Sequence, residues 1–230
     1  MANWKEDFVV KNQFSRPGSK LLGVRGIVMH WTADPGATAD AEQNFFDGSD
    51  GGGGRYASAH FFVDRNSAVL TIPLDEVAYH ANDHPCRIDK LAATASYYQN
   101  GGANLTAIGI EMCVEPDGSI HGSTVKQAEQ VALELCKQYN LNPLMDIYRH
   151  FDVTGKNCPA PWVDHPELFT QFKKDVNTLL HPPTNTYTIK SGDNFWNLEN
   201  SLKLPHGTLV KLNPNVNPGK LQIGQKINIK

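Results

Sequence analysis

The sequence predicts a mixed α/β protein, in which helices flank a central mixed sheet, followed by a small second domain. Short runs of branched apolar residues alternate with longer segments of helical periodicity, which indicates strands interleaved with helices. The stretch HPPTN then interrupts the last helical pattern, and the short segment after it differs in character. We therefore expect a first domain over residues 1–180, a stiff linker over 181–185 and a second domain over 186–230.

The predicted strands are short and end at turn residues. Val24–Trp31 is rich in branched side chains, as is typical of a buried strand. Ile108–Met112 alternates apolar with small or polar residues, which predicts that Glu111 lies on the face opposite to the core. The other expected strands are His60–Asp64 and Val69–Ile72, paired through an Arg65-Asn66-Ser67 turn, and Glu76–His80.

Helical periodicity is clearest from Thr124 to Leu141. Thr124 and Gln127 make a plausible capping box at its start. Its apolar residues follow a 3-4-3-4 spacing, at Val125, Ala128, Ala132, Leu135 and Tyr139. Two further helices are expected, one capped by Thr38 and running through Phe46, and one after Pro166 with Leu168, Phe172, Val176 and Leu179 on one side.

The glycine run Gly51–Gly54 lacks the Lys-Ser/Thr ending of a phosphate-binding loop. We interpret it as a flexible loop. It either borders a cleft or is a plain surface excursion, and the sequence does not decide between the two.

Composition excludes several classes of protein. A chain of 230 residues with 40% hydrophobic residues can bury a substantial core, and a net charge of -3 gives no support for nucleic acid as a partner. Four cysteines are too sparse for a disulfide scaffold, so Cys86, Cys113 and Cys136 are expected to be reduced thiols. The start, MANWKEDFVV, is polar, and no run is long and apolar enough to span a membrane. We therefore expect synthesis in a cytosol, without a signal peptide or membrane insertion.

Candidate metal ligands lie in the segment YRHFDVTGKNCP, which carries His150 and, eight residues later, Cys158. His30 ends an apolar run far upstream. Imidazole and thiolate are good zinc ligands, and three ligands brought together from distant segments are typical of a catalytic rather than a structural zinc site. The residues alone also allow two buried histidines and an inert apolar thiol, which is the commoner situation for such residues.

Five separated motifs extend the pattern. VMHWTA, SAHFFVD, VAYHA, NLTAIGIEM and YRHFDVTGKNCP occur in that order between Gly23 and Leu180. Together they resemble the zinc-dependent N-acetylmuramoyl-L-alanine amidases, the family of T7-type lysozyme, AmpD-type amidases and many phage endolysins. The resemblance implies an amidase-like fold and one catalytic Zn2+ held by His30, His150 and Cys158.

The same resemblance suggests roles for further residues. Glu111 is expected to be the general base and Lys156 to stabilise an oxyanion, while His80 and Trp31 are expected to contact substrate. Asp152 and Thr154 are candidates for orienting the late loop, and His60 is expected to pack in the core. T7-type and AmpD-like relatives carry a tyrosine where this chain has Ala59. This departure favours the branch of the family that depends on a glutamate.

The C-terminal segment has a second resemblance. Its pattern YTIKSGDNFW…LVKLNPN…LQIGQKINI, within Thr186–Lys230, is similar to the LysM module, a βααβ unit. LysM modules bind N-acetylglucosamine-containing glycans, including peptidoglycan. We expect Gly192, Asp193, Asn194 and Phe195 to bind glycan.

Both resemblances imply the same substrate. The expected reaction is hydrolysis of the amide between N-acetylmuramic acid and L-alanine in peptidoglycan. A monomeric phage or prophage endolysin, released to the cell wall through a holin lesion, fits the lack of an export signal. The alternatives are a bacterial autolysin, a zinc endopeptidase of the stem peptide, and a non-catalytic peptidoglycan-recognition protein.

Overall fold

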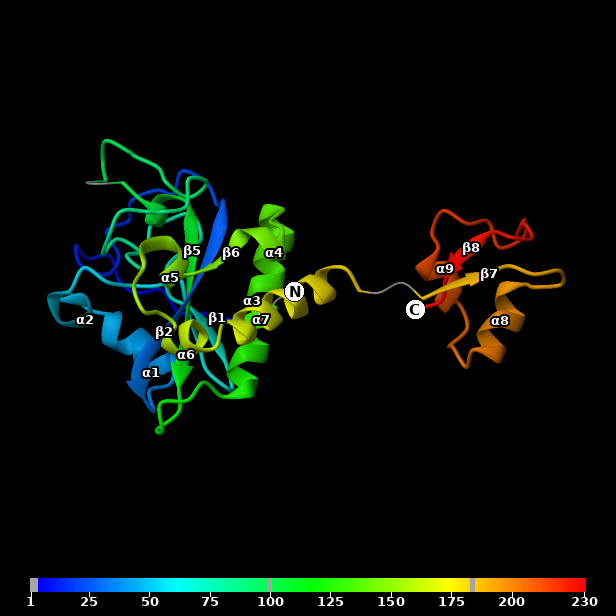
Figure 1. Ribbon diagram of the computed structural model, residues 1–230, viewed down its shortest axis with the longest axis horizontal. Coiled ribbons are helices and arrows are strands. Elements are labelled where there is room, and N and C mark those ends of the chain that lie inside the picture. The colour runs from blue at the N-terminus through cyan, green and yellow to red at the C-terminus, as the bar shows by residue number, and fades with distance from the viewer. Residues whose placement is uncertain (1–3, 99–100, 183–184) are drawn as a thin grey trace. The chain divides into compact units, whose positions relative to one another are not determined.

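The computed structural model describes residues 4–98, 101–182 and 185–230, and the chain divides into two compact units, Met1–Leu180 and His181–Lys230 (Figure 1). Pro183 and Thr184, in the predicted linker, lie outside the described residues. The first unit is built on a six-stranded mixed sheet in the order β1-β4-β3-β5-β2-β6. The strands are β1 (Lys5–Glu6), β2 (Gly26–Pro35), β3 (Phe61–Val63), β4 (Ala68–Leu70), β5 (Ala107–Val114) and β6 (Ile147–Arg149).

Helices cover both faces of this sheet, as the sequence predicts (Figure 1). The longest are α3 and α7, which pack on one face, while α1 packs on the other. The helices of the unit are α1 (Ala39–Phe46), α2 (Gly51–Gly54), α3 (Gly122–Tyr139), α4 (Pro143–Asp146), α5 (His150–Thr154), α6 (Ala160–Asp164) and α7 (Pro166–Leu180), with a 3-10 turn, η1, at Ala103–Leu105.

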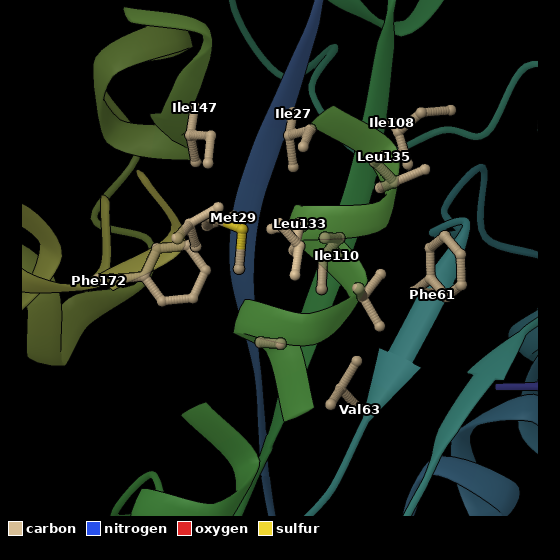
Figure 2. Packing of buried hydrophobic residues seen from close by; sticks show 14 of the residues in the cluster. Ile27, Met29, Phe61, Val63, Ile108, Ile110, Leu133, Leu135, Ile147 and Phe172 are labelled. Carbon is tan, nitrogen blue, oxygen red and sulfur yellow. The ribbon is translucent and has the colours of Figure 1, made fainter. Parts of the chain in front are cut away.

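The main core lies between the sheet and α3 and α7. Figure 2 shows Ile27 and Met29 of β2 beside Ile108 and Ile110 of β5, all facing the α3 side chains. The parallel register pairs Ile27 with Ile108 and Met29 with Ile110. Because side chains alternate along a strand, the intervening residues of both strands point to the opposite face. That opposite face carries the polar site.

Two predicted strands and one predicted helix agree with the structure, and two predicted helices need correction. The predicted strand pair is β3 and β4, and Thr38 caps α1 by accepting a hydrogen bond from the Ala41 amide at 3.2 Å. The predicted capping box of α3 is wrong, because the helix begins earlier and the His121 side chain accepts from the Ser123 amide. In α7 the buried face is Phe169, Phe172 and Val176, whereas Leu168 and Leu179 are exposed.

The strand predicted over Glu76–His80 is wrong. Within the described residues Glu76 makes a single isolated bridge, to Lys20. The amides of His80 and Ala81 donate to the side chain of Asn104 instead of to a neighbouring strand. A side chain therefore replaces the sheet ladder here, which residue pattern alone does not reveal.

The glycine run is an ordered turn rather than an irregular loop. All four residues of α2 have positive φ, from 32° at Gly51 to 73° at Gly54. Such left-handed backbone is open to glycine without strain, so the four consecutive glycines allow a turn that other residues would resist. The next residue, Arg55, donates from Nε to the Gly52 carbonyl at 3.1 Å.

The second unit has the predicted βααβ order. It consists of β7 (Thr186–Thr188), α8 (Phe195–Ser201), α9 (Thr208–Leu212) and β8 (Lys226–Asn228), with β7 and β8 antiparallel. Its own core contains Ile189, Phe195, Leu198, Leu209 and Ile227. Within the ranges 4–98, 101–182 and 185–230, no helix has both the length and the apolarity needed to cross a bilayer.

Candidate metal centre and active-site cleft

Strand register brings together the first two site residues. His30 of β2 is the direct partner of Glu111 of β5 in the parallel pair. Both therefore point away from the α3 face, and His30 Nδ1 lies 3.9 Å from Glu111 Oε1. This confirms the sequence expectation that Glu111 faces away from the main core.

His150 reaches the same place through the neighbouring strand. β6 pairs with β2 so that Arg149 is the partner of Met29, and the residues that follow them are His150 and His30. The two imidazole rings lie 4.7 Å apart between centroids. Cys158 returns to this point because its carbonyl accepts from the Phe151 amide at 2.9 Å, and its Sγ lies 3.7 Å from His30 Nδ1.

These three side chains form a candidate metal centre. One donor atom from each of His30, His150 and Cys158 lies within 4.8 Å of the other two, and all three residues are buried. Donor atoms around a tetrahedral zinc are separated by roughly 3.5 Å, close to the sulfur–nitrogen distance seen here. His150 Nδ1 has no hydrogen-bond partner among the described residues. A buried, unpartnered nitrogen beside a thiol and a second imidazole fits a metal ion.

Hydrogen bonds orient both histidines toward this centre. His150 Nε2 lies 2.7 Å from Asp83 Oδ1, and because a carboxylate accepts, Nε2 carries the proton and Nδ1 presents a lone pair. His80 Nε2 lies 3.2 Å from the Ala107 carbonyl, so it donates there and leaves His80 Nδ1 as an acceptor. That acceptor lies 3.1 Å from His30 Nε2, which must then donate and leave its own Nδ1 free for the centre.

The surroundings keep the metal-free centre neutral. Burial lowers the pKa of His30 well below its ordinary value, and the neighbouring His150 and His80 lower it further. Burial also lowers the pKa of His150, although Asp83 opposes this effect, and burial raises the pKa of the Cys158 thiol to about 12. Two neutral imidazoles are ready to bind a cation, whereas the thiol must release its proton when the metal binds.

Glu111 lies beside the candidate centre as a strongly perturbed acid. Burial raises its pKa well above the ordinary value, the nearby Glu42 carboxylate adds to this, and the Lys156 charge opposes it. Its side chain is only 20% exposed, and Oε2 has no partner in the part of the chain that the structure describes. A carboxylate in this setting is suited to accept a proton and pass it on.

A cleft of about 600 Å3 opens onto this cluster. His30, Glu111 and Cys158 line one part of it, together with the predicted substrate-binding residues Trp31 and His80. Lys156 also lines it and is exposed. The wall further from the predicted ligands includes Glu42, Phe45, Phe46 and Arg55, so the segment that follows the glycine turn does border the cleft.

Three residues singled out from the sequence, Asp152, Thr154 and His60, make hydrogen bonds to groups other than the predicted metal ligands. The Asp152 carboxylate accepts hydrogen bonds from the backbone amide and the guanidinium of Arg149. Its partner is therefore Arg149 and not a predicted metal ligand. Thr154 donates to Asp83 Oδ2 at 3.4 Å, so it supports the His150 contact indirectly. His60 is fully buried, as expected, and bridges the Gly109 amide and the Glu76 carbonyl.

The residues that sequence reasoning missed are Asp83 and Glu42. Asp83 follows the VAYHA motif by two positions, which is the only local signal for it. Glu42 falls within an ordinary helical pattern and has no motif around it. The contact of Asp83 with His150 and the place of Glu42 in the cleft both depend on tertiary structure, because the neighbouring side chains come from other segments.

In the second unit, the predicted glycan-binding positions differ from one another. Gly192 has a φ of 88°, which favours glycine in that turn, and Asp193 Oδ2 accepts from the Lys190 amide at 2.6 Å. Asn194 caps α8 by accepting from the Asn197 amide. Phe195 is 5% exposed and packs in the core of the unit. Its ring therefore contributes to that core and does not face a ligand.

Comparison with known proteins gives the families that the two units match. Residues 20–161 match the N-acetylmuramoyl-L-alanine amidase family, and residues 187–230 match the LysM domain. A probable N-acetylmuramoyl-L-alanine amidase of Bacillus licheniformis is 49% identical over 186 residues, covering 80% of this chain and 50% of that protein. The N-acetylmuramoyl-L-alanine amidase BlyA of Bacillus subtilis is 44% identical over 185 residues, which cover 78% of this chain and 48% of BlyA.

A solved structure supports the fold of the first unit. The catalytic domain of XlyA is 28% identical, with a TM-score of 0.60, over 76% of this chain and 99% of that domain. The chain spans about half the length of the curated Bacillus relatives it matches first. The match over residues 20–161, with the matching fold, shows that the chain belongs to the N-acetylmuramoyl-L-alanine amidase family and carries a LysM domain.

Proposed function

We propose that this protein is a zinc-dependent N-acetylmuramoyl-L-alanine amidase, which hydrolyses the amide between N-acetylmuramic acid and the L-alanine of the stem peptide. The observation that carries this proposal is the gathering of donor atoms from His30, His150 and Cys158 beside Glu111, at a cleft that His30, Cys158 and Glu111 line. Three donors from two distant segments, with an acid next to them, match the arrangement of catalytic rather than structural zinc sites. The family membership and the two amidases quoted above point to the same bond.

The reaction divides between the metal and the side chains around it. When bound by His30, His150 and Cys158, Zn2+ supplies a Lewis acid for the carbonyl and lowers the pKa of a water molecule. Glu111 accepts a proton from the attacking water and delivers it to the leaving amine. Its unpartnered Oε2 is the atom proposed for that transfer.

The remaining cleft residues bind and orient the substrate. Lys156 is exposed on the cleft wall, two residues before Cys158, and we assign it to stabilise the negative charge that develops on the carbonyl oxygen. Trp31 offers an aromatic surface to substrate. His80 lines the cleft but both of its ring nitrogens are engaged, so its main role in this proposal is to orient His30.

The LysM domain is proposed to hold the enzyme on its substrate. The turn with Gly192, Asp193 and Asn194 is our candidate for contact with N-acetylglucosamine-containing glycan. A tether to an insoluble polymer raises the local concentration of the cleft near scissile bonds without tight binding at the cleft itself. This explains why the two domains occur on one chain.

The biological setting is proposed from the sequence expectations. We infer a monomeric phage or prophage endolysin that is made in the host cytoplasm and reaches the wall through a holin lesion. A bacterial autolysin with the same activity is the second candidate, favoured by the two Bacillus amidases quoted above.

Digestion of purified peptidoglycan tests the activity. New N-terminal L-alanine together with intact muramic acid is the expected result, and removal of zinc by a chelator should abolish its release. New amines elsewhere in the stem peptide would instead identify a zinc endopeptidase. Binding to the wall without any release would identify a non-catalytic recognition protein.

A further inference from the structure

One buried acid in the cleft has no part in the chemistry described above. Glu42 lies in the first turn of α1 and is only 6% exposed. It lines the same cleft as His30 and Glu111. Its Oε1 is buried and has no hydrogen-bond partner among the residues that the structure describes. It is not part of the His30, His150 and Cys158 cluster.

An unpartnered buried carboxyl group is unfavourable for folding, since the lost hydration is not replaced. Within the described residues, three side-chain atoms have this property: Glu42 Oε1, Glu111 Oε2 and His150 Nδ1. The proposed reaction accounts for the last two, as the proton-transfer atom and a metal donor. Glu42, like Glu111, lines the cleft, which indicates that its Oε1 too meets a ligand.

The charges near Glu42 indicate what that ligand carries. Asp34, which lines the cleft, raises the pKa of Glu42 in addition to burial, and Arg55 lowers it. Arg55 follows the glycine turn, is exposed, and lies over the Phe45 ring at 5.2 Å. This end of the cleft therefore presents acids and a guanidinium close together.

A peptide fits such a wall better than a glycan does. The stem peptide carries N–H or ammonium donors together with carboxylates, whereas an N-acetylated glycan is uncharged once its lactyl carboxyl is in amide linkage. We propose that Glu42 is a specificity-determining residue, whose carboxyl accepts a hydrogen bond from an N–H or ammonium group of the stem peptide beyond its first residue, L-alanine. This inference rests on the proposed amidase function, because it assumes peptidoglycan in the cleft.

The first test compares full-length wild type with Glu42→Gln and Glu42→Ala. Titration calorimetry with the free stem tetrapeptide, a product of the reaction, should show binding weakened about tenfold by Glu42→Ala and by a smaller factor by Glu42→Gln, because the Gln amide keeps an accepting oxygen but not the charge. The melting temperature should stay the same or rise, because no partner of Oε1 is lost. Asp40→Asn is the matched control, since Asp40 is exposed in the same helical turn and contacts Lys5 at 2.9 Å.

A structural role for Glu42 would produce the opposite pattern. A clear fall in melting temperature with unchanged tetrapeptide binding would overturn the inference. Equal weakening by Asp40→Asn would also overturn it, because the effect would then reflect general charge.

A second test separates the stem peptide from the sugar. With N-acetylmuramoyl-tetrapeptide, Glu42→Ala should raise KM about tenfold and leave kcat nearly unchanged. With N-acetylmuramoyl-L-alanine, which lacks the rest of the stem peptide, the same change should have no effect on KM. An equal effect on both substrates would place the donor on the sugar or the first residue and refute the peptide assignment.

The two proposals fail in different ways. If wild type released no N-terminal L-alanine but bound the tetrapeptide through Glu42, the amidase function alone would be wrong. If wild type released L-alanine and Glu42→Ala bound the tetrapeptide normally, the inference about Glu42 alone would be wrong.

Discussion

Replacing Asp83 tests how the predicted metal ligand His150 is oriented. The Asp83 carboxylate accepts from His150 Nε2 at 2.7 Å and is the group that directs Nδ1 toward the centre. Loss of such a carboxylate–histidine contact typically weakens metal binding by about 10- to 100-fold, which is about 1.4–2.7 kcal/mol. Asn retains an accepting oxygen but not the charge, so we expect about tenfold weaker zinc binding for Asp83→Asn and about a hundredfold for Asp83→Ala.

The assay is competition for zinc between each variant and a chromophoric chelator at neutral pH. Asp152→Asn is the matched control, because Asp152 lies in α5 beside His150 but pairs with Arg149 at 2.6 Å. It should lower stability and leave zinc affinity unchanged. Wild-type affinity in Asp83→Ala, or a loss of affinity confined to Asp152→Asn, would refute the assignment of hydrogen bonds around His150.

Three further predictions concern the ligands, the LysM domain and the pH dependence of stability. His30→Ala and Cys158→Ser should each lose bound zinc, measured by metal analysis, and abolish wall lysis while wall binding persists; lysis at the wild-type rate would contradict the ligand set. Deleting Thr186–Lys230 should weaken sedimentation with purified walls and spare cleavage of soluble fragments, and unchanged sedimentation would show that the LysM domain is not the anchor. Burial, with Asp34, raises the pKa of Glu42 from an ordinary 4.5 to about 7, so the folded state holds this proton more tightly than the unfolded state. Stability should therefore fall as pH rises from about 4.5 to 7, by on the order of 2 kcal/mol after allowance for solvent screening. Urea unfolding should show this loss in wild type but not in Glu42→Gln, and a difference between the two that is independent of pH would contradict the prediction.

The local pattern of apolar and polar residues was sufficient to predict the face on which a side chain lies, wherever that face follows from its position in a strand or helix. The alternation in Ile27-Val28-Met29-His30 and in Ile108–Met112 already separates a core face from a polar face, and the structure confirms it. Local pattern failed where a distant side chain replaces a regular partner. The side chains of Ser58 and Asn104 take the amides of Tyr79 and His80, which a strand at Glu76–His80 would have offered to a neighbour. His121 rather than Thr124 caps α3.

The residue types and their order also indicated the chemistry of the candidate site. His30, His150 and Cys158 were identified as donors before their positions were known, and the structure places them within 4.8 Å of one another. Glycan-binding positions were less predictable. Phe195 is buried in the core of its unit, whereas the adjacent Trp196 is 64% exposed, a difference set by the packing of α8.

By itself the sequence determined most of the strand and helix periods, the candidate metal ligands and the order of the two units, because each depends on neighbouring residues or on motifs whose order is read along the chain. Tertiary structure decided which groups meet. The pairing of β6 with β2 brings His150 to His30, the path of the segment after β4 brings Asp83 to His150, and the packing of α1 leaves Glu42 unpartnered in the cleft. These contacts join segments far apart in the chain, so strand register and loop path determine them. Local periodicity in the sequence predicts neither the register nor the path.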